Sequence, residues 1–251
     1  MAEDSYDHTV RRRTARTPYA AGVVLAGGSG VRMGAGMNKV YLPLAGRRLV
    51  SWSLAAFGRV PEIGVLVLVA RPDDGELVDS ILDRELTGIP VEVVYGGDTR
   101  QESELSALRR LAGRVDDGTV DIVLLHDGAR PLVSPALIAE VVAAAREHGG
   151  AIPGLPADDL VTVTDDVVTG PVLDAAIRAQ TPQGFRAAPL IDAYEKAARE
   201  NFVGTDTASC MERYSALPVH WVHGDQRNVK ITYPHDLTIA EQFLADSNHR
   251  T

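Results

Sequence analysis

Runs of consecutive apolar residues alternate with segments of helical periodicity, and this alternation constrains the fold more than any other feature. Strands are predicted at Ala21–Ala26, Gly64–Ala70, Val91–Tyr95 and Asp121–Leu125. Helices are predicted at Val50–Phe57, Glu76–Leu82, Gln101–Leu111 and Pro135–Glu147. Strands that are apolar along their whole length must be covered on both faces. The pattern therefore predicts an α/β fold, with a Rossmann-like, mostly parallel, twisted sheet between two layers of helices.

The rhythm changes near residue 157. The segment "LVTVTDDVVT" (Leu160–Thr169) predicts two short strands joined at Asp165-Asp166. Because an isolated two-stranded ribbon is marginally stable in water, we expect it to pack on the main sheet or on a partner subunit. Residues 1–18 lack apolar periodicity and predict a disordered tail. We treat 19–251 as one domain from which an arm, at about 157–180, is extruded.

Composition limits the classes of function. The formal net charge of −9 argues against a sequence-independent nucleic-acid binder, which needs a basic surface. No apolar run approaches the roughly 20 residues that cross a bilayer, so we expect no membrane partner. A single cysteine, Cys210, excludes an intrachain disulfide and favours a cytoplasmic location.

Ligands of such sheets bind beyond the carboxyl ends of the strands. The first of these ends carries the glycine loop "VVLAGGSGVRMG" (Val23–Gly34). The loop lacks the G-x-x-x-x-G-K-[ST] order of a Walker A motif. It also fails the G-x-G-x-x-G fingerprint of dinucleotide sites, because Met33 stands at the third glycine. Kinase-like and NAD-dependent functions therefore lose their main support.

Two cations accompany this loop, Arg32 within it and Lys39 seven residues later. Glycines let backbone N–H groups approach an anion closely, and a guanidinium can bridge two phosphate oxygens. The combination favours a triphosphate ligand. The alternative is a tight turn with solvated basic side chains.

The segment "LAGGSGVRMGAGMNKVYLPLAGRRLVSWSL" (Leu25–Leu54) resembles the nucleotide loop of sugar-nucleotide transferases. Later segments narrow the resemblance to the 2-C-methyl-D-erythritol 4-phosphate cytidylyltransferase family and its polyol-phosphate relatives. They occur in the family's order and are "GGDTRQES", "LLHDGARPLV", "AQTPQGF", "GTDTAS" and "NVKITYPHDLTIAE". The resemblance implies a fold of the nucleotide-diphospho-sugar transferase type.

It also implies a reaction in which CMP passes from CTP to a polyol phosphate, with Mg²⁺ as cofactor and release of pyrophosphate. A phosphate monoester is already an anionic nucleophile at neutral pH, so no general base is needed. The catalyst must align two anions and neutralise charge on the phosphates. Lysines, arginines and a metal suit this task, whereas a catalytic histidine would be superfluous.

By resemblance, Arg32, Lys39 and Lys230 are the catalytic cations. Asp127 is the predicted metal or ribose contact. The predicted CTP-binding residues are Leu25, Ala26, Gly27, Gly28, Gly30, Gly97, Asp98 and Ser103. The last three match the positions that hold cytosine, although Asp98 could instead cap the following helix.

The acceptor side matches the family less well. Arg130 and Thr181 match acceptor contacts, while His126 is expected to be a packed residue. Leu160 stands where the family has a phosphate-binding threonine, and Leu173 where it has an arginine that reaches the neighbouring subunit. Leucine can hold no phosphate. Arg178, five residues after Leu173, is a candidate replacement.

Several alternatives stay open at this level. The acceptor is 2-C-methyl-D-erythritol 4-phosphate or another polyol phosphate, such as ribitol 5-phosphate. A non-catalytic nucleotide-binding paralogue and a guanylyl or uridylyl transferase are the competing classes of function. The family commonly forms homodimers through interlocked arms, which implies a homodimer here.

Overall fold

The computed structural model describes residues 17–28, 38–172 and 175–248, and within them eight strands form one sheet. The strand order is β10-β7-β11-β6-β1-β4-β5, and β12 pairs with β7. The strands are β1 (Tyr19–Leu25), β4 (Ile63–Ala70), β5 (Glu92–Tyr95), β6 (Val120–Asp127), β7 (Gly150–Pro156), β10 (Ile177–Ala179), β11 (Gln183–Arg186) and β12 (Val219–His223).

The four predicted strands are confirmed as β1, β4, β5 and β6. They are neighbours in the sheet and all run parallel. Their carboxyl ends therefore meet at one edge, which is where such sheets place ligands. β11 breaks the parallel order, because it pairs antiparallel with both β6 and β7. The sheet is thus mixed, with a parallel half that carries the glycine loop.

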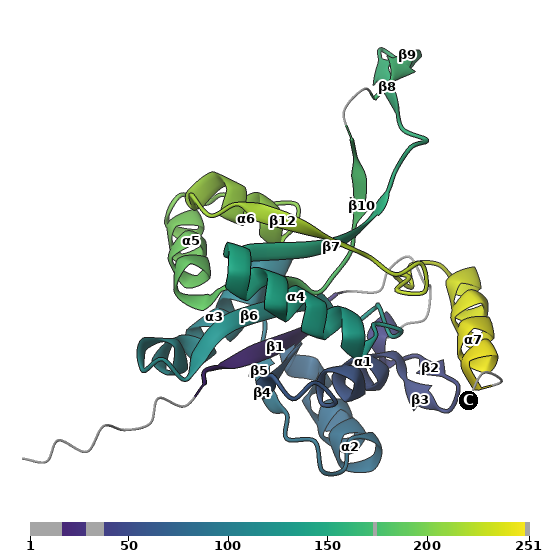
Figure 1. Ribbon diagram of the computed structural model, residues 1–251. Coiled ribbons are helices and arrows are strands. Elements are labelled where there is room, and N and C mark those ends of the chain that lie inside the picture. Colours follow the sequence, from purple (N-terminus) through teal and green to yellow (C-terminus); the bar gives the residue numbers. More distant parts are fainter. Residues whose placement is uncertain (1–16, 29–37, 173–174, 249–251) are drawn as a thin grey trace, which may run out of the picture.

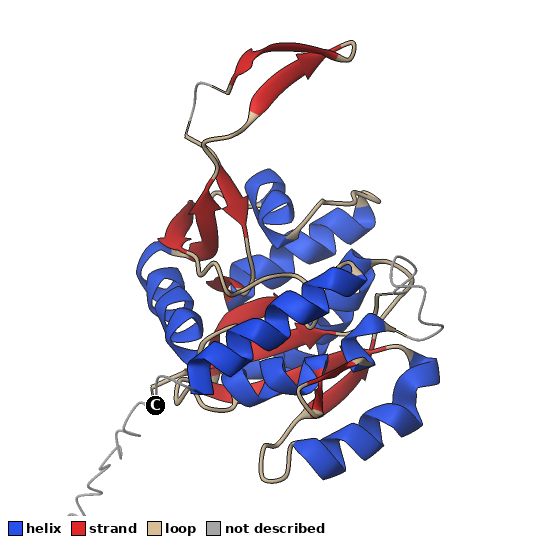
Figure 2. Ribbon diagram, turned by 90° about the vertical axis from the view of Figure 1, so that its right-hand side faces the viewer, coloured by secondary structure: helices blue, strands red, loops and turns tan. Residues whose placement is uncertain are grey.

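Helices cover both faces of the sheet, as predicted (Figure 1, Figure 2). Apolar side chains of α1, α2 and α4 pack on one face, and those of α3, α5 and α6 pack on the other. No helix in the described part of the chain is both long and apolar enough to cross a membrane. The helices are α1 (Leu49–Phe57), α2 (Gly75–Glu85), α3 (Arg100–Asp116), α4 (Pro135–His148), α5 (Ala187–Arg199), α6 (Thr207–Tyr214) and α7 (Pro234–Asn248).

The central strand β1 shows why the sequence folds this way. Ala20 and Val24 belong to the core on one face, and Ala21 and Val23 to the core on the other. All four are fully buried. Since successive side chains of a strand point to opposite faces, only a strand without polar residues can sit between two helical layers. Each buried valine contributes about 1.5–3 kcal/mol to folding.

A third apolar cluster anchors the segment that carries Lys230. The cluster contains four buried residues: Leu44 of β2 (Pro43–Leu44), Leu49 of α1, Ala240 of α7, and Ile231, which precedes α7. The backbone N–H of Ile231 donates to the carbonyl of Ala129 at 2.8 Å. The residues just before α7 are therefore fixed beside the end of β6.

The predicted ribbon is a hairpin of β8 (Val161–Thr164) and β9 (Val167–Pro171). Asp165 and Asp166 form its turn with φ of +48° and +63°, a left-handed geometry that Asp tolerates in two-residue hairpin loops. The option that the ribbon packs on the main sheet is wrong. The two strands pair only with each other among the described residues, and the hairpin stands away from the body (Figure 2).

The end of β6 is tied to the chain before β11 by a line of hydrogen bonds through His126. The Asp127 N–H donates to Thr181 Oγ1 at 3.1 Å, and the Thr181 hydroxyl lies 3.0 Å from His126 Nδ1. His126 Nε2 lies 3.2 Å from the Arg130 carbonyl, which can only accept. The imidazole therefore carries its proton on Nε2 and accepts from Thr181 through Nδ1. His126 is a fully buried packing residue, as expected.

Burial lowers the pKa of His126 from 6.5 to about 4, which predicts acid sensitivity. Between these two values the unfolded chain binds a proton at this residue and the folded chain does not. Stability is therefore complete above pH 6.5 and falls as the pH drops toward 4, by about 3 kcal/mol from this group. Denaturant unfolding measured from pH 7.5 to 4.5 should show this loss.

The variant H126Q should be less stable than the native chain at pH 7 and should lose less stability on acidification. H223Q, which changes an exposed histidine of β12, should retain the native pH dependence. Equal pH slopes for H126Q and H223Q would exclude the role given to His126.

Candidate active site

A hollow of about 660 Å³ lies at the edge where the carboxyl ends of β1, β4, β5 and β6 meet. The structure brings most of the predicted nucleotide and catalytic residues together around it. Ala26 is buried behind the hollow and does not line it. The predicted residues that line it are Leu25, Gly27, Gly28, Lys39, Gly97, Asp98, Ser103, Asp127 and Lys230.

Arg32, Gly30 and Leu173 lie outside the described residues, so their predicted roles stay predictions. Lys39 begins the short 3₁₀ helix η2 (Lys39–Tyr41). Asn38 caps η2, since its Oδ1 accepts from the Val40 N–H at 3.4 Å. The Asn38 amide also donates to the Ala26 carbonyl. Asn38, which the sequence analysis did not single out, thus links Lys39 to the end of β1.

The Gly96-Gly97 turn needs its glycines because two side chains approach it closely. A Cβ on Gly96 would lie 2.4 Å from Ser103 Oγ, and one on Gly97 would lie 2.5 Å from Glu102 Cβ. The Ser103 hydroxyl donates to the Gly97 carbonyl at 3.3 Å. The backbone of this turn therefore lines the hollow directly.

Thr99, rather than Asp98, caps α3. Its hydroxyl accepts from the Glu102 N–H at 3.1 Å, and the Glu102 carboxylate accepts from the Thr99 N–H at 3.0 Å. This reciprocal pair is a capping box, which satisfies two backbone donors of the first turn. The cap sets the first turn of α3, so that Arg100 and Ser103 both line the hollow.

Asp127, the last residue of β6, holds two cations. Its Oδ1 accepts from Arg100 Nη1 at 2.6 Å, and its Oδ2 lies 2.7 Å from Lys230 Nζ. Burial alone would raise the pKa of the Asp127 carboxyl, but Arg100 and Lys230 outweigh burial and hold it well below its usual range. Asp127 is therefore ionised throughout the physiological pH range.

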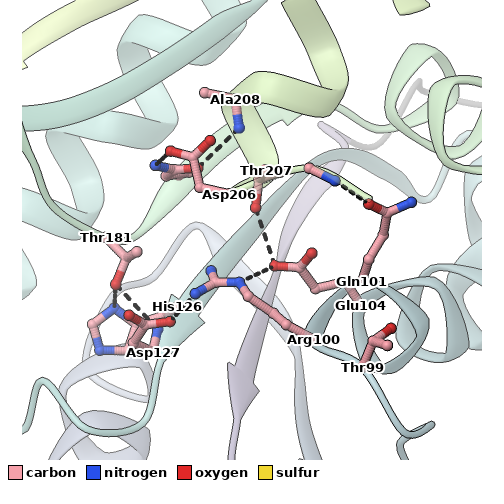
Figure 3. Close-up of polar contacts among 12 residues, drawn as sticks. Thr99, Arg100, Gln101, Glu104, His126, Asp127, Thr181, Asp206, Thr207 and Ala208 are labelled. Atoms are coloured by element: carbon pink, nitrogen blue, oxygen red, sulfur yellow. Dashed lines mark hydrogen bonds and ion pairs between the residues drawn. The ribbon is translucent and has the colours of Figure 1, made fainter. Parts of the chain in front are cut away.

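Arg100 and Glu104 are site residues that sequence reasoning missed. Arg100 Nε donates to Glu104 Oε1 at 2.9 Å, so Arg100 bridges Glu104 and Asp127 (Figure 3). Glu104 is only 2% exposed and also accepts from Tyr194 at 2.7 Å and Thr207 at 3.2 Å. Burial raises the pKa of Tyr194, and Glu104 raises it further, so its phenol remains a donor. Arg100 lies within the segment "GGDTRQES", and Glu104 is the residue directly after it, so the two are spaced four apart as in an ordinary surface ion pair.

None of the three predicted acceptor residues lines the hollow. Arg130 Nη1 donates to the Asn228 carbonyl at 2.7 Å, and Arg130 Nε is buried without a partner among the described residues. Thr181 is engaged in the hydrogen-bond line through His126. Arg178, on β10, pairs with Asp159 at 2.5 Å and is largely exposed. Acceptor binding by these three residues stays a prediction.

Charges of both signs converge on the hollow. Lys39 and Lys230 carry primary ammonium groups and line the hollow, and so does Arg100, which pairs with Asp127. In the described part of the chain, no three His, Cys, Asp or Glu side chains are placed to hold a metal ion together. Asp127 is already paired with two cations, so the ammonium groups of Lys39 and Lys230 beside it suit a polyanionic ligand such as a triphosphate.

Comparisons with known proteins show the family of the chain. The family described as IspD, 2-C-methyl-D-erythritol 4-phosphate cytidylyltransferase, matches residues 20–246. An enzyme of that name from Synechococcus sp. (strain JA-3-3Ab) is 37% identical over 228 residues, which cover 88% of this chain and 95% of the relative. Another from Geobacter metallireducens is also 37% identical, over 89% of this chain and 97% of the relative.

Solved structures give the same result. A 4-diphosphocytidyl-2C-methyl-D-erythritol synthase from Anaerococcus prevotii superposes with a TM-score of 0.79 at 29% identity, covering 91% of this chain and 97% of its own. The 2-C-methyl-D-erythritol 4-phosphate cytidylyltransferase from Thermus thermophilus superposes with a TM-score of 0.68 at 30% identity, covering 89% and 98%. The chain therefore belongs to the 2-C-methyl-D-erythritol 4-phosphate cytidylyltransferase family, whose members are nucleotidyltransferases.

Proposed function

We propose that this chain transfers CMP from CTP to 2-C-methyl-D-erythritol 4-phosphate in the cytoplasm, as a step of isoprenoid precursor synthesis, and releases pyrophosphate. The observation that carries the proposal is the convergence of Lys39, Lys230 and the Gly97 turn on one hollow. Membership of the family supports the same reaction.

The chain's cations supply the chemistry. The phosphate of the acceptor is already an anion at neutral pH, so its oxygen attacks the α-phosphorus of CTP without a general base. Lys230 neutralises charge on the α-phosphate, while Lys39 and the predicted Arg32 hold the departing pyrophosphate. Both substrates are anions, and holding them in line lowers the barrier further.

The turn after β5 recognises the base. Cytosine presents a 4-amino donor and a ring carbonyl acceptor. The backbone carbonyl and N–H of Gly97 are an acceptor and a donor within a turn too tight for any side chain at Gly96, and the Ser103 hydroxyl, which donates to that carbonyl, holds the turn in place. Asp98 lines the same wall of the hollow.

Asp127 fits the predicted Mg²⁺ only in part. Mg²⁺ in nucleotide sites takes one or two carboxylates and completes its coordination with phosphate oxygens and water. Asp127 supplies one ionised carboxylate at the wall of the hollow. It would hold Mg²⁺ together with the phosphates of CTP, where the metal would neutralise charge on them.

The acceptor is proposed to bind beside β10, near Arg130, Arg178 and Thr181. The Thr181 hydroxyl already donates to His126 and accepts from the Asp127 N–H. One lone pair of its oxygen therefore remains to accept a hydrogen bond from a hydroxyl of the polyol substrate. Leu160 is partly exposed at the start of the hairpin, and its side chain can form no hydrogen bond. The phosphate of the polyol substrate is therefore proposed to bind to Arg130 and Arg178.

The activity assay tests the proposal. With CTP, Mg²⁺ and 2-C-methyl-D-erythritol 4-phosphate, the native chain should form a CDP-polyol that mass spectrometry detects, with equimolar pyrophosphate. K230Q should lower kcat roughly 100- to 1,000-fold, the usual effect of removing one group that stabilises the transition state. K196Q changes a lysine on α5, away from the hollow, and should leave kcat unchanged.

Parallel reactions with ribitol 5-phosphate, and with UTP or GTP in place of CTP, test the alternatives. If only ribitol 5-phosphate gave a CDP-polyol, it would be the acceptor instead of 2-C-methyl-D-erythritol 4-phosphate. Nucleotide binding without product from any polyol phosphate would indicate a non-catalytic paralogue.

We also propose that the hairpin of β8 and β9 docks on a second copy of the chain. Four valines of the hairpin, Val161, Val163, Val167 and Val168, are 52% to 63% exposed. A ribbon with so many exposed valines is poorly stable on its own, and burial against a partner would remove them from water. The homodimer expected for the family provides such a partner.

The native chain should therefore have twice the mass of the 26.9 kDa monomer in sedimentation equilibrium. Val163 and Val168 are cross-strand partners, so V163E/V168E places two charges on one face of the hairpin and should shift the mass toward the monomer. V203E changes an exposed valine between α5 and α6 and should not. A monomeric native chain, or equal masses for both variants, would refute the docking.

A further inference from the structure

Arg100 occupies an unusual position for a helix-surface arginine, because its guanidinium lies between two buried carboxylates (Figure 3). Its Nε donates to Glu104 Oε1 at 2.9 Å, and its Nη1 donates to Asp127 Oδ1 at 2.6 Å. A guanidinium has several donors in a fixed fork, so it can hold two carboxylates at once in a defined geometry. Arg100 thus joins the first turn of α3 to the end of β6.

Glu104 anchors this bridge from within the protein. It receives hydrogen bonds from three elements: Arg100 on α3, Tyr194 on α5 and Thr207 on α6. Glu104 does not line the hollow and cannot meet a ligand there. A buried carboxylate is costly unless it is paired, and Arg100 is the cation that pairs with Glu104.

The two cations that pair with Asp127, Lys230 and Arg100, differ in how freely their side chains can move. The Lys230 side chain is 41% exposed, lines the hollow, and has a flexible stem. Arg100 is held at two atoms, and its Nη2 is buried without a hydrogen-bond partner among the described residues. An unpaired buried donor lowers stability, and such exceptions are typical of functional sites.

We infer that Arg100 is a further positioning residue of this active site, which fixes the Asp127 carboxylate so that Lys230 can exchange it for a phosphate of the nucleotide. The inference rests on the proposed function. Lys230 is one of two cations on Asp127, so once Lys230 has moved, Arg100 still compensates the Asp127 carboxylate and holds it at the hollow.

The variant R100K tests this inference. Lysine keeps the charge but lacks the fork, so it cannot hold both carboxylates in the same geometry. We expect kcat to fall roughly 10- to 100-fold, as for other residues that orient a functional group, with a smaller change in the KM for CTP. The Mg²⁺ concentration for half-maximal rate should rise.

R109K is the matched control. Arg109 lies on the same helix and pairs with Glu195 of α5 at 2.7 Å, away from the hollow. It should retain native kcat. E104Q and E195Q change the carboxylates that pair with Arg100 and Arg109. E104Q keeps a side chain that forms hydrogen bonds but replaces the carboxylate by an uncharged amide, and should lower kcat. E195Q should leave kcat unchanged. Should R100K fail to fold, E104Q carries the test. Equal kcat for R100K and R109K, or for E104Q and E195Q, would overturn the inference.

Crystal structures separate this inference from the proposed function. The Asp127 carboxylate should change its rotamer or its hydrogen-bond partners in R100K and stay in place in R109K, whether or not the chain makes a CDP-polyol. An unchanged Asp127 in R100K would refute the positioning role. Absence of product from the native chain would refute the proposed reaction and leave this structural test valid.

Discussion

The ionised carboxylate of Asp127 is the constraint on which the site depends. Asp127 is the last residue of β6, opposite the end of β1, and is buried. Its negative charge must therefore be compensated by cations. Arg100 and Lys230 provide them, at 2.6 and 2.7 Å from its two oxygens. The fold brings α3 and the segment before α7 to the same strand end, although they are far apart in the sequence. The pairing holds Arg100 and Lys230 together at the edge of the hollow.

The parallel half of the fold was predictable because its strands are apolar on both faces. The antiparallel half was not. β7 has the sequence "GAIPGLP", whose glycines and prolines argue against a strand. Packing explains the glycines: a Cβ on Gly150 would lie 2.7 Å from the Phe185 ring, and one on Gly154 would lie 2.6 Å from Ile177. Such requirements come from neighbours that a local pattern does not reveal.

The site was predictable to the extent that its motifs follow strands. Lys39, Ser103, Asp127 and Lys230 were predicted and do line one hollow. Arg100 and Glu104 escaped notice because residues four apart on a helix usually form an exposed ion pair. Their importance comes from Asp127, 27 residues from Arg100, and from α5 and α6, which enclose Glu104. Only the tertiary fold distinguishes this pair from the surface pairs of the same helix.

The hairpin has a different relation to the rest of the chain. Its valines belong to none of the three core clusters of the described residues, whereas β10 at its base is bonded to β7. Mutations in the hairpin therefore meet little resistance from packing in the body. The parallel half of the sheet, by contrast, ends in buried residues and glycines that tolerate few replacements. Packing within the chain therefore leaves the projecting ribbon open to remodelling during evolution, and only the proposed contact with a second copy would restrain it.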